Sequence, residues 1–161
     1  MGTDKFPHYS GMDFVPDNAF VIEDAPVRLT CGEHIRSVEF IRRKGTDLIF
    51  IEAKSSFANP ASSPAPYRTE VSEICEKFIH SLNILSAIKV GAVDEALPAQ
   101  FDYSGKASLM FILVVRDHKA QWCRPIKREL EQLLPVHIKK IWKPSVYVIN
   151  SETARKQNLL S

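Results

Sequence analysis

Two carboxylates and an amine are the side chains whose types and spacing best suit chemistry in this chain: Glu39, Glu52 and Lys54. Residues 37–54 have the pattern of a β-hairpin, with Glu39 on its first strand and the other two at the end of its second. Charged groups beside so apolar a segment are costly to bury without a purpose. Two carboxylates that leave room for water suit Mg²⁺, with Mn²⁺ as an alternative ion, and a nearby lysine could orient or deprotonate a water or offset charge on a phosphate. The spacing therefore predicts a metal site with Glu39 and Glu52 as its ligands.

Convergence of these groups depends on the register of the hairpin. Alternation along a strand places Phe50, Glu52 and Lys54 on one face. With residues 44–45 as a two-residue turn, Glu39 falls opposite Phe50 and one diagonal step from Glu52, on that same face. A one-residue slip would send Glu39 to the other face. The alternative interpretation is an ordinary hairpin edge on which Glu52 and Lys54 are simply solvated.

With these residues, the segment resembles the PD-(D/E)XK nuclease family, which has the restriction-endonuclease-like fold. The resemblance covers the hairpin, the helix after it and the next apolar strand. In that family an acid on one strand and a D/E-x-K on the next bind Mg²⁺ and hydrolyse phosphodiesters. By position, Glu39 corresponds to the first acid, Glu52 to the second acid and Lys54 to the lysine. The chain departs from the pattern in having Glu rather than Asp as the first acid, preceded by Val38 rather than Pro.

The resemblance implies a metal-dependent nuclease, or a nuclease subunit of a larger assembly. The family often adds a glutamate from an N-terminal helix, for which Glu23 and Glu33 are candidates by position alone. A second hypothesis, from another class, is a catalytically inactive member of the same fold that binds nucleic acid or a protein partner. The small size of the chain favours work in a complex or as a homodimer.

Charge is distributed unevenly along the chain. Residues 1–100 contain 10 Lys and Arg against 14 Asp and Glu, whereas residues 101–161 contain 11 against 5. A basic surface beside an acidic cleft suits a protein that handles phosphodiesters, because phosphate contacts supply most non-specific affinity for nucleic acid. The candidate nucleic-acid contacts are Tyr67, Arg68, Lys127, Arg128, Lys139 and Lys140. The alternative is that these are solvated helix faces.

Composition is compatible with this interpretation. A chain of 161 residues, of which 45% are hydrophobic, is expected to form a single domain over residues 1–161. It has no apolar run long enough to span a membrane and no apolar segment of a signal peptide at its start. Its three widely spaced cysteines suit free thiols in a reducing cytoplasm. No P-loop, G-x-G-x-x-G or G-x-S-x-G motif is present.

Periodicity predicts the elements that must position these residues. Short strands are expected at 19–23 and 27–31, a helix from Thr69 to about Gly91, a buried strand at 108–115, a helix at 124–134 that starts with Pro125, a short helix at 136–142 and a strand at 146–150. The connection at 55–67 has few apolar anchors and would hang over the site. The order predicts an α/β fold with a mixed central β-sheet flanked by helices, for which the resemblance implies a restriction-endonuclease-like topology.

Overall fold

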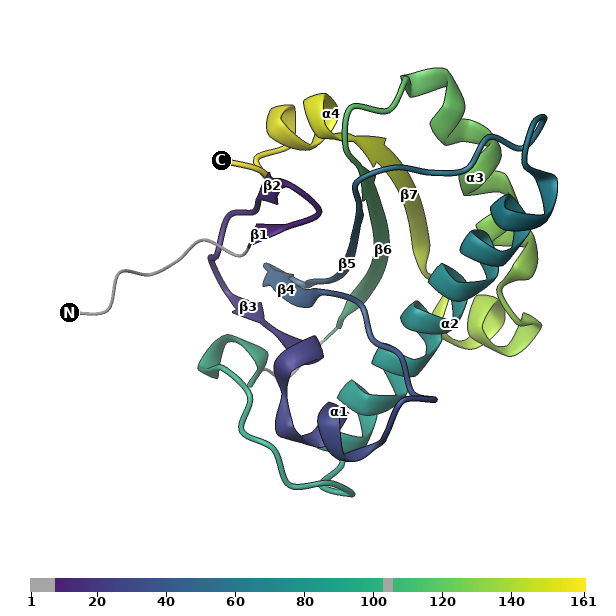
Figure 1. Ribbon diagram of the computed structural model, residues 1–161. Coiled ribbons are helices and arrows are strands. Elements are labelled where there is room, and N and C mark those ends of the chain that lie inside the picture. Colours follow the sequence, from purple (N-terminus) through teal and green to yellow (C-terminus); the bar gives the residue numbers. More distant parts are fainter. Residues whose placement is uncertain (1–7, 103–105) are drawn as a thin grey trace.

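The computed structural model describes residues 8–102 and 106–161 and is built around one mixed sheet (Figure 1). The five strands of the sheet lie in the order β3-β4-β5-β6-β7. They are β3 (Ala19–Phe20), β4 (Phe40–Lys44), β5 (Asp47–Lys54), β6 (Ser108–Val115) and β7 (Ser145–Asn150). β3, β4 and β5 pair in antiparallel fashion, whereas β5, β6 and β7 pair in parallel. The predicted α/β class with a mixed central sheet flanked by helices is confirmed.

Two long helices cover one face of the sheet. They are α2 (Pro64–Lys89), which connects β5 to β6, and α3 (Ala120–Leu133), which leads from β6 towards β7. Because parallel crossovers are right-handed and both step in the same direction across the sheet, the two helices lie on the same face. Figure 1 shows them together on one side of the sheet. Within the described part of the chain, no helix has the length and apolar character of a membrane span.

The opposite face of the sheet is covered by shorter elements from both ends of the chain. A small hairpin of β1 (His8–Tyr9) and β2 (Met12–Asp13) lies there with α4 (Ser151–Lys156), as Figure 1 shows. Phe14 forms a β-bridge with Leu160, which joins the two ends of the chain. The remaining elements are η1 (Ile22–Asp24), α1 (Pro26–Thr30), η2 (Ala99–Phe101) and the π-helical turn η3 (Ile138–Trp142).

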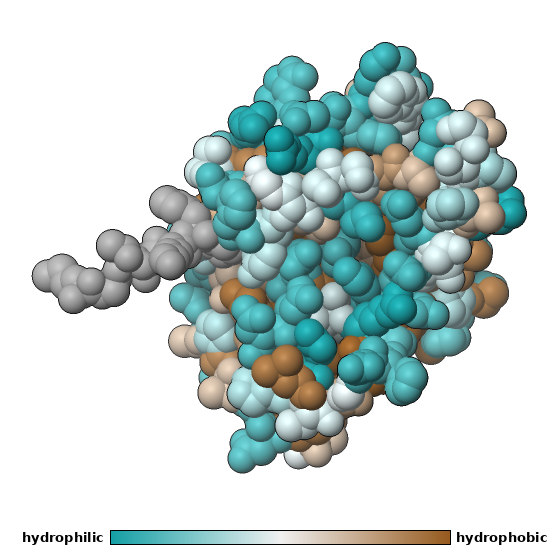
Figure 2. Space-filling view, in the orientation of Figure 1, coloured by the Kyte–Doolittle hydropathy of each residue, from teal (hydrophilic) through white to brown (hydrophobic). Residues whose placement is uncertain are grey.

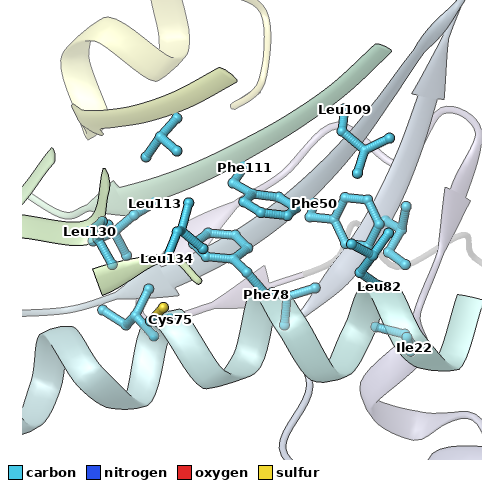
Figure 3. Close-up of a cluster of buried hydrophobic side chains, with 14 of the residues drawn as sticks. Ile22, Phe50, Cys75, Phe78, Leu82, Leu109, Phe111, Leu113, Leu130 and Leu134 are labelled. Atoms are coloured by element: carbon cyan, nitrogen blue, oxygen red, sulfur yellow. The ribbon is translucent and has the colours of Figure 1, made fainter. Parts of the chain in front are cut away.

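The larger hydrophobic core lies between the sheet and the two long helices (Figure 3). Phe78 of α2 stacks on Phe111 of β6, with ring centroids 4.7 Å apart, and Phe50 of β5 meets Phe111 edge-on at 5.4 Å. Burial of each such ring stabilises the fold by roughly 1.5–3 kcal/mol. Cys75 is buried in the same core, and all three cysteines are unpaired. This core fixes α2 over β5, which matters for the site.

Several element boundaries differ from the sequence-based expectation. The strand predicted at 27–31 is wrong, since Pro26 occupies the first turn of the helix α1, a favoured position for proline. α2 begins at Pro64 rather than Thr69, whose hydroxyl donates to the Ala65 carbonyl at 3.1 Å inside the helix. α3 begins at Ala120, so that Pro125 lies within the helix instead of at its start. The strand at 108–115 is confirmed, with both faces covered.

Part of the connection after β5, which was expected to have few apolar anchors and to hang over the site, packs against the core. Phe57 and Ala58 pack against the larger core, and the Phe57 ring meets that of Tyr67 at 5.7 Å. Tyr67 is buried in α2, so the expectation that it contacts nucleic acid is wrong. The segment is therefore fixed to the core at Phe57 and Ala58, while residues 59–62 are exposed.

On the face of the molecule shown in Figure 2, hydrophobic residues are scattered among hydrophilic ones. Single exposed apolar residues are normal on a solvated surface. The homodimer or larger complex expected from the size of the chain stays a prediction.

Candidate active site

The β4–β5 hairpin has a different register from the predicted one. Lys44 pairs with Asp47, so the turn consists of Gly45 and Thr46. Gly45 has a φ of +60°, which suits the first central position of a type II′ turn, where glycine is preferred. The pairing is displaced by two residues from the predicted one, and Phe40 lies opposite Ile51.

Glu39 lies where this ladder ends. β4 begins at Phe40, and the Glu39 N–H donates to the Ile51 carbonyl at 3.1 Å, the same residue that Phe40 faces. Side chains alternate between the two faces only within the strand, and β4 begins one residue after Glu39. The alternation therefore does not determine the direction of the Glu39 side chain. The charges of Glu52 and Lys77 both act on the pKa of the Glu39 carboxyl, so the two acids lie within electrostatic range of one another, and their sharing of one ion stays a prediction.

Glu52 is the most deeply buried charged group of the site. Its side chain is 1% exposed, and its Oε1 accepts a hydrogen bond from Lys77 Nζ at 2.9 Å. Within the described residues, its Oε2 is buried without a hydrogen-bond partner. Burial raises the pKa of Glu52 to about 7 even though Lys77 acts to lower it. Glu52 is thus poised to change its charge near neutral pH.

The pKa of Glu39 is raised further than that of Glu52. Burial, a hydrogen bond to Glu23 and the charge of Glu52 together raise the pKa of Glu39 to about 9. At neutral pH its carboxyl therefore holds a proton. Glu23, in η1, was a candidate by position and joins the cluster, whereas Glu33 is exposed in the turn after α1.

Tyr9 borders the same cluster from the hairpin on the other face of the sheet. Its ring stacks on Phe40 at 5.9 Å. Burial, followed by the charge of Glu39, raises the pKa of the Tyr9 hydroxyl to about 12. Glu39 therefore lies within electrostatic reach of elements that cover both faces of the sheet, at the end of the ladder.

The two lysines of the site have different partners. Lys54, at the end of β5, lies 3.9 Å from Glu70 Oε2 of α2, which is too far for a hydrogen bond. Lys77, also on α2, bonds Glu52 directly. Burial alone would lower the pKa of Lys77, but Glu52 and the neighbouring acids raise it overall, so Lys77 stays charged.

Lys77 belongs to a row of polar residues along α2 that sequence reasoning missed. Glu73 pairs with Arg36 at 3.0 Å, and Ser81 Oγ accepts a hydrogen bond from the Val38 N–H at 2.9 Å. Residues 73, 77 and 81 are spaced by four, which places them on one side of the helix. That spacing beside the apolar stripe is the signal that could have found them. The row holds the segment before Glu39 in place.

The cluster offers a partial fit to a divalent cation. Among the residues that the structure describes, no group of three or more His, Cys, Asp and Glu is arranged to hold a metal ion. Mg²⁺, however, often binds through one or two carboxylates, with water and substrate phosphate as further ligands. The unpartnered Oε2 of Glu52 suits one such ligand. Glu39 could be a second after losing its proton, since metals bind the ionised carboxylate.

The basic residues expected to contact nucleic acid are not gathered around this cluster. Arg68 is exposed on α2, two residues before Glu70, a spacing that places the two side chains on different sides of the helix. The other four residues are exposed on α3 and η3: Lys127, Arg128, Lys139 and Lys140. η3 precedes the start of β7, whereas Glu52 pairs with Leu113 towards the end of β6. Lys139 and Lys140 therefore lie towards the opposite end of the sheet.

Two other basic residues, Arg116 and Lys119, follow β6 at the end of the sheet where β5 also ends. The backbone N–H of Arg116 donates to the Lys54 carbonyl at 2.9 Å, whereas its guanidinium pairs with Asp117 and lies against Gly11 of the β1–β2 hairpin. Lys119 lies over the Trp122 ring, 4.7 Å from its centroid, and Trp122 is 46% exposed. The carboxyl ends of parallel strands meet at one edge of a sheet. The position of these residues directly after an apolar strand could therefore have predicted that they lie at the same edge as the end of β5.

Comparison of the chain with protein-family models, curated proteins and solved structures finds no match. The resemblance of the hairpin to a nuclease motif therefore rests on Glu39, Glu52 and Lys54 and on the arrangement around them.

Proposed function

We propose that this protein is a metal-dependent nuclease, or the nuclease subunit of a larger assembly, with Glu52 and Glu39 as ligands of Mg²⁺ or Mn²⁺. The observation that carries the proposal is the buried Oε2 of Glu52, which has no hydrogen-bond partner among the described residues and lies beside a second acid. A buried carboxylate oxygen without a partner is costly. A divalent cation at this point would satisfy it.

Each residue of the cluster then has a role. The ion, when bound, would neutralise charge on a phosphodiester and lower the pKa of an attacking water. Lys54 orients that water or offsets charge on the phosphate, since its amine is not hydrogen-bonded to Glu70. Lys77 holds Glu52 in its orientation through the 2.9 Å hydrogen bond.

The proposal extends to the fold and the setting. The mixed sheet with an acid-bearing hairpin supports a restriction-endonuclease-like topology. The exposed Lys119, which follows β6 at the end of the sheet where β5 also ends, and the exposed Arg68 of α2 support nucleic acid as the substrate. The three unpaired cysteines support a reducing compartment such as the cytoplasm.

A second candidate is a catalytically inactive module of the same fold that binds nucleic acid or a protein. The ion pair of Lys77 with Glu52 favours it, because a lysine can compensate a buried carboxylate without any metal. The protonated Glu39 would then be a structural group.

Cleavage assays separate the two candidates. Wild-type protein is incubated with labelled single- and double-stranded DNA and RNA, with Mg²⁺, with Mn²⁺ or with a chelator. Lys54→Ala should leave metal binding largely intact and lower the rate by ~10²-fold or more, whereas Glu52→Gln should abolish both. Glu33→Gln, which changes an exposed acid outside the cluster, is the control and should behave as wild type.

Equal cleavage by all variants would reveal a contaminating nuclease. An absence of cleavage by wild type on every substrate, even with Mn²⁺, would favour the inactive module.

A further inference from the structure

A large groove lies on the face of the sheet away from the two long helices. The hairpin β1–β2, α4 and the C-terminal segment cover only part of this face. The cavity that remains has a volume of about 750 Å³, within the range of small-molecule sites. Its wall is largely apolar and includes Ile49, Met110, Ile112 and Ile149.

Arg42 of β4 lines this groove and is the unusual feature of its wall. The residue is 8% exposed, and its Nε is buried without a hydrogen-bond partner. Across the described residues, no carboxylate forms an ion pair with it. Its neighbour across the ladder is Ile49, an apolar residue. A guanidinium with its Nε buried and unpaired, in the wall of an otherwise apolar groove, favours an anion as the ligand, because a buried polar group without a partner is unfavourable.

The other charged residues of the groove leave this positive charge uncompensated. Lys44 and Asp47 face each other across the hairpin end, at the border of the groove. Their charges oppose one another, so the net charge of the lining is that of Arg42. An arginine also offers paired N–H donors that match the two oxygens of a carboxylate or a phosphate.

We propose that this groove binds a small amphiphilic anion. A carboxylate or phosphate monoester head would pair with Arg42, and an apolar body would lie against Ile49, Met110 and Ile112. The site is separate from the acidic cluster because the two lie on opposite faces of the sheet: Ile49 and Ile112 of the groove face away from α2, whereas Glu52 bonds Lys77 of α2. The proposal therefore does not depend on the proposed nuclease function.

Calorimetric titration with three probes of equal chain length tests the proposal: octanoate, octyl phosphate and 1-octanol. At least one of the two anions should bind at a single site, at least tenfold more tightly than octanol. Which anion binds more tightly identifies the head group. Chemical-shift changes of the methyl groups of Met110 and Ile112 should locate the bound probe.

Variants connect binding to Arg42. Arg42→Met should weaken binding of the anion at least tenfold and leave that of octanol unchanged. Arg124→Met, which removes one exposed positive charge on α3, is the matched control and should bind as wild type. Ile149→Glu places a carboxylate in the groove and should also weaken anion binding, which keeps the test informative if Arg42→Met does not fold. Glu52→Gln should bind the probes normally, since its site is separate.

Three results would each overturn the proposal: binding of neither octanoate nor octyl phosphate, binding of both anions no tighter than that of octanol, or unchanged anion binding by a folded Arg42→Met.

Discussion

At the scale of single residues, the main feature of the site is which of two lysines, Lys77 or Lys54, pairs with Glu52. Its Oε1 is bonded to Lys77, while its Oε2 has no hydrogen-bond partner in the described part of the chain. Lys54, the residue that the sequence pattern favours, stands instead beside Glu70. Lys77 is thus the group that stabilises the charge of Glu52, and under the proposed function Lys54 is the amine that acts on a ligand.

This division of roles predicts different effects on stability. Lys77→Met leaves Glu52 buried without its partner and should lower the free energy of unfolding at pH 8 by roughly 1–3 kcal/mol. Lys54→Met should lower it by less than about 1 kcal/mol, because its ion pair is long and partly exposed. Urea denaturation measures both. In the double variant Lys77→Met/Glu52→Gln, much of the lost free energy of unfolding should be recovered. If the effects of the two single substitutions on this free energy simply add, the result would argue against the pairing of Lys77 with Glu52.

The protonated state of Glu39 predicts a pH dependence of stability. Its folded-state pKa of about 9 lies above the ordinary value of 4.5, so the folded state binds more protons than the unfolded state between these pH values. The contribution of Glu39 to stability therefore falls as pH rises from 4.5 towards 9. Glu39→Gln, which cannot ionise, should weaken this fall and raise the melting temperature at pH 8 relative to wild type.

At pH 4.5, where Glu39 is protonated in wild type, the two proteins should melt at similar temperatures. Glu33→Gln serves as the exposed control and should follow wild type at both pH values. A difference between Glu39→Gln and wild type that is the same at both pH values would contradict the assignment.

At the scale of elements, α2 is the scaffold of the site. One side of the helix packs Phe78 into the core, and the neighbouring row carries Lys77 and Ser81. Ser81 is fully buried and holds the Val38 N–H, directly before Glu39. The position of Glu39 therefore depends on a hydrogen bond from a helix that follows it by some forty residues in the chain.

Removal of that hydrogen bond should loosen the site. Ser81→Ala leaves the buried Val38 N–H without a partner and should lower the free energy of unfolding by about 1–3 kcal/mol. Ser72→Ala, at an exposed position of the same helix, should change it by less than about 0.5 kcal/mol. Chemical denaturation measures both values. Equal effects of the two variants would show that Ser81 does not support the segment before β4.

The sequence predicted some elements well for an identifiable physical reason. β6 was predicted with its observed bounds because an uninterrupted apolar run between polar ends has few alternatives. The start of α2 was missed because Pro64 and Pro66 lie in its first turn, where proline is tolerated yet also typical of a loop. The strand expected at 27–31 is the helix α1 for the same reason, since Pro26 begins it.

The site could be predicted only in part. Glu39, Glu52 and Lys54 follow from alternation along strands, a local rule. Lys77 is supplied by a helix, and its partner becomes visible only when the helix is packed on β5. The direction of the Glu39 side chain could not be derived, because it depends on the residue at which the β4–β5 ladder ends. That residue depends in turn on the position of the turn between the strands.

At the scale of the whole molecule, the two faces of the sheet have separate features. The helical face carries the acidic cluster at the carboxyl end of β5, and the other face carries the groove with Arg42 near its start. A sheet with parallel strands is commonly covered by helices on both faces. Here the second face is covered by short elements, and this leaves room for the groove.

Binding of a metal ion to the acidic cluster should be coupled to proton release from the folded protein. An ion must displace protons from Glu39 and Glu52, whose pKa values are about 9 and about 7. The affinity for Mg²⁺ should therefore rise by up to ~100-fold per pH unit below pH 7, where two protons are displaced, and by ~10-fold per pH unit between pH 7 and 9, where one is displaced. Above pH 9 the affinity should level off. Calorimetry in buffers of different ionisation enthalpy measures both affinity and proton release. Glu39→Gln should bind more weakly but lose the rise between pH 7 and 9, and Glu33→Gln should keep it. An affinity independent of pH would remove Glu39 from the ligand set, and an absence of binding at every pH would favour the inactive module.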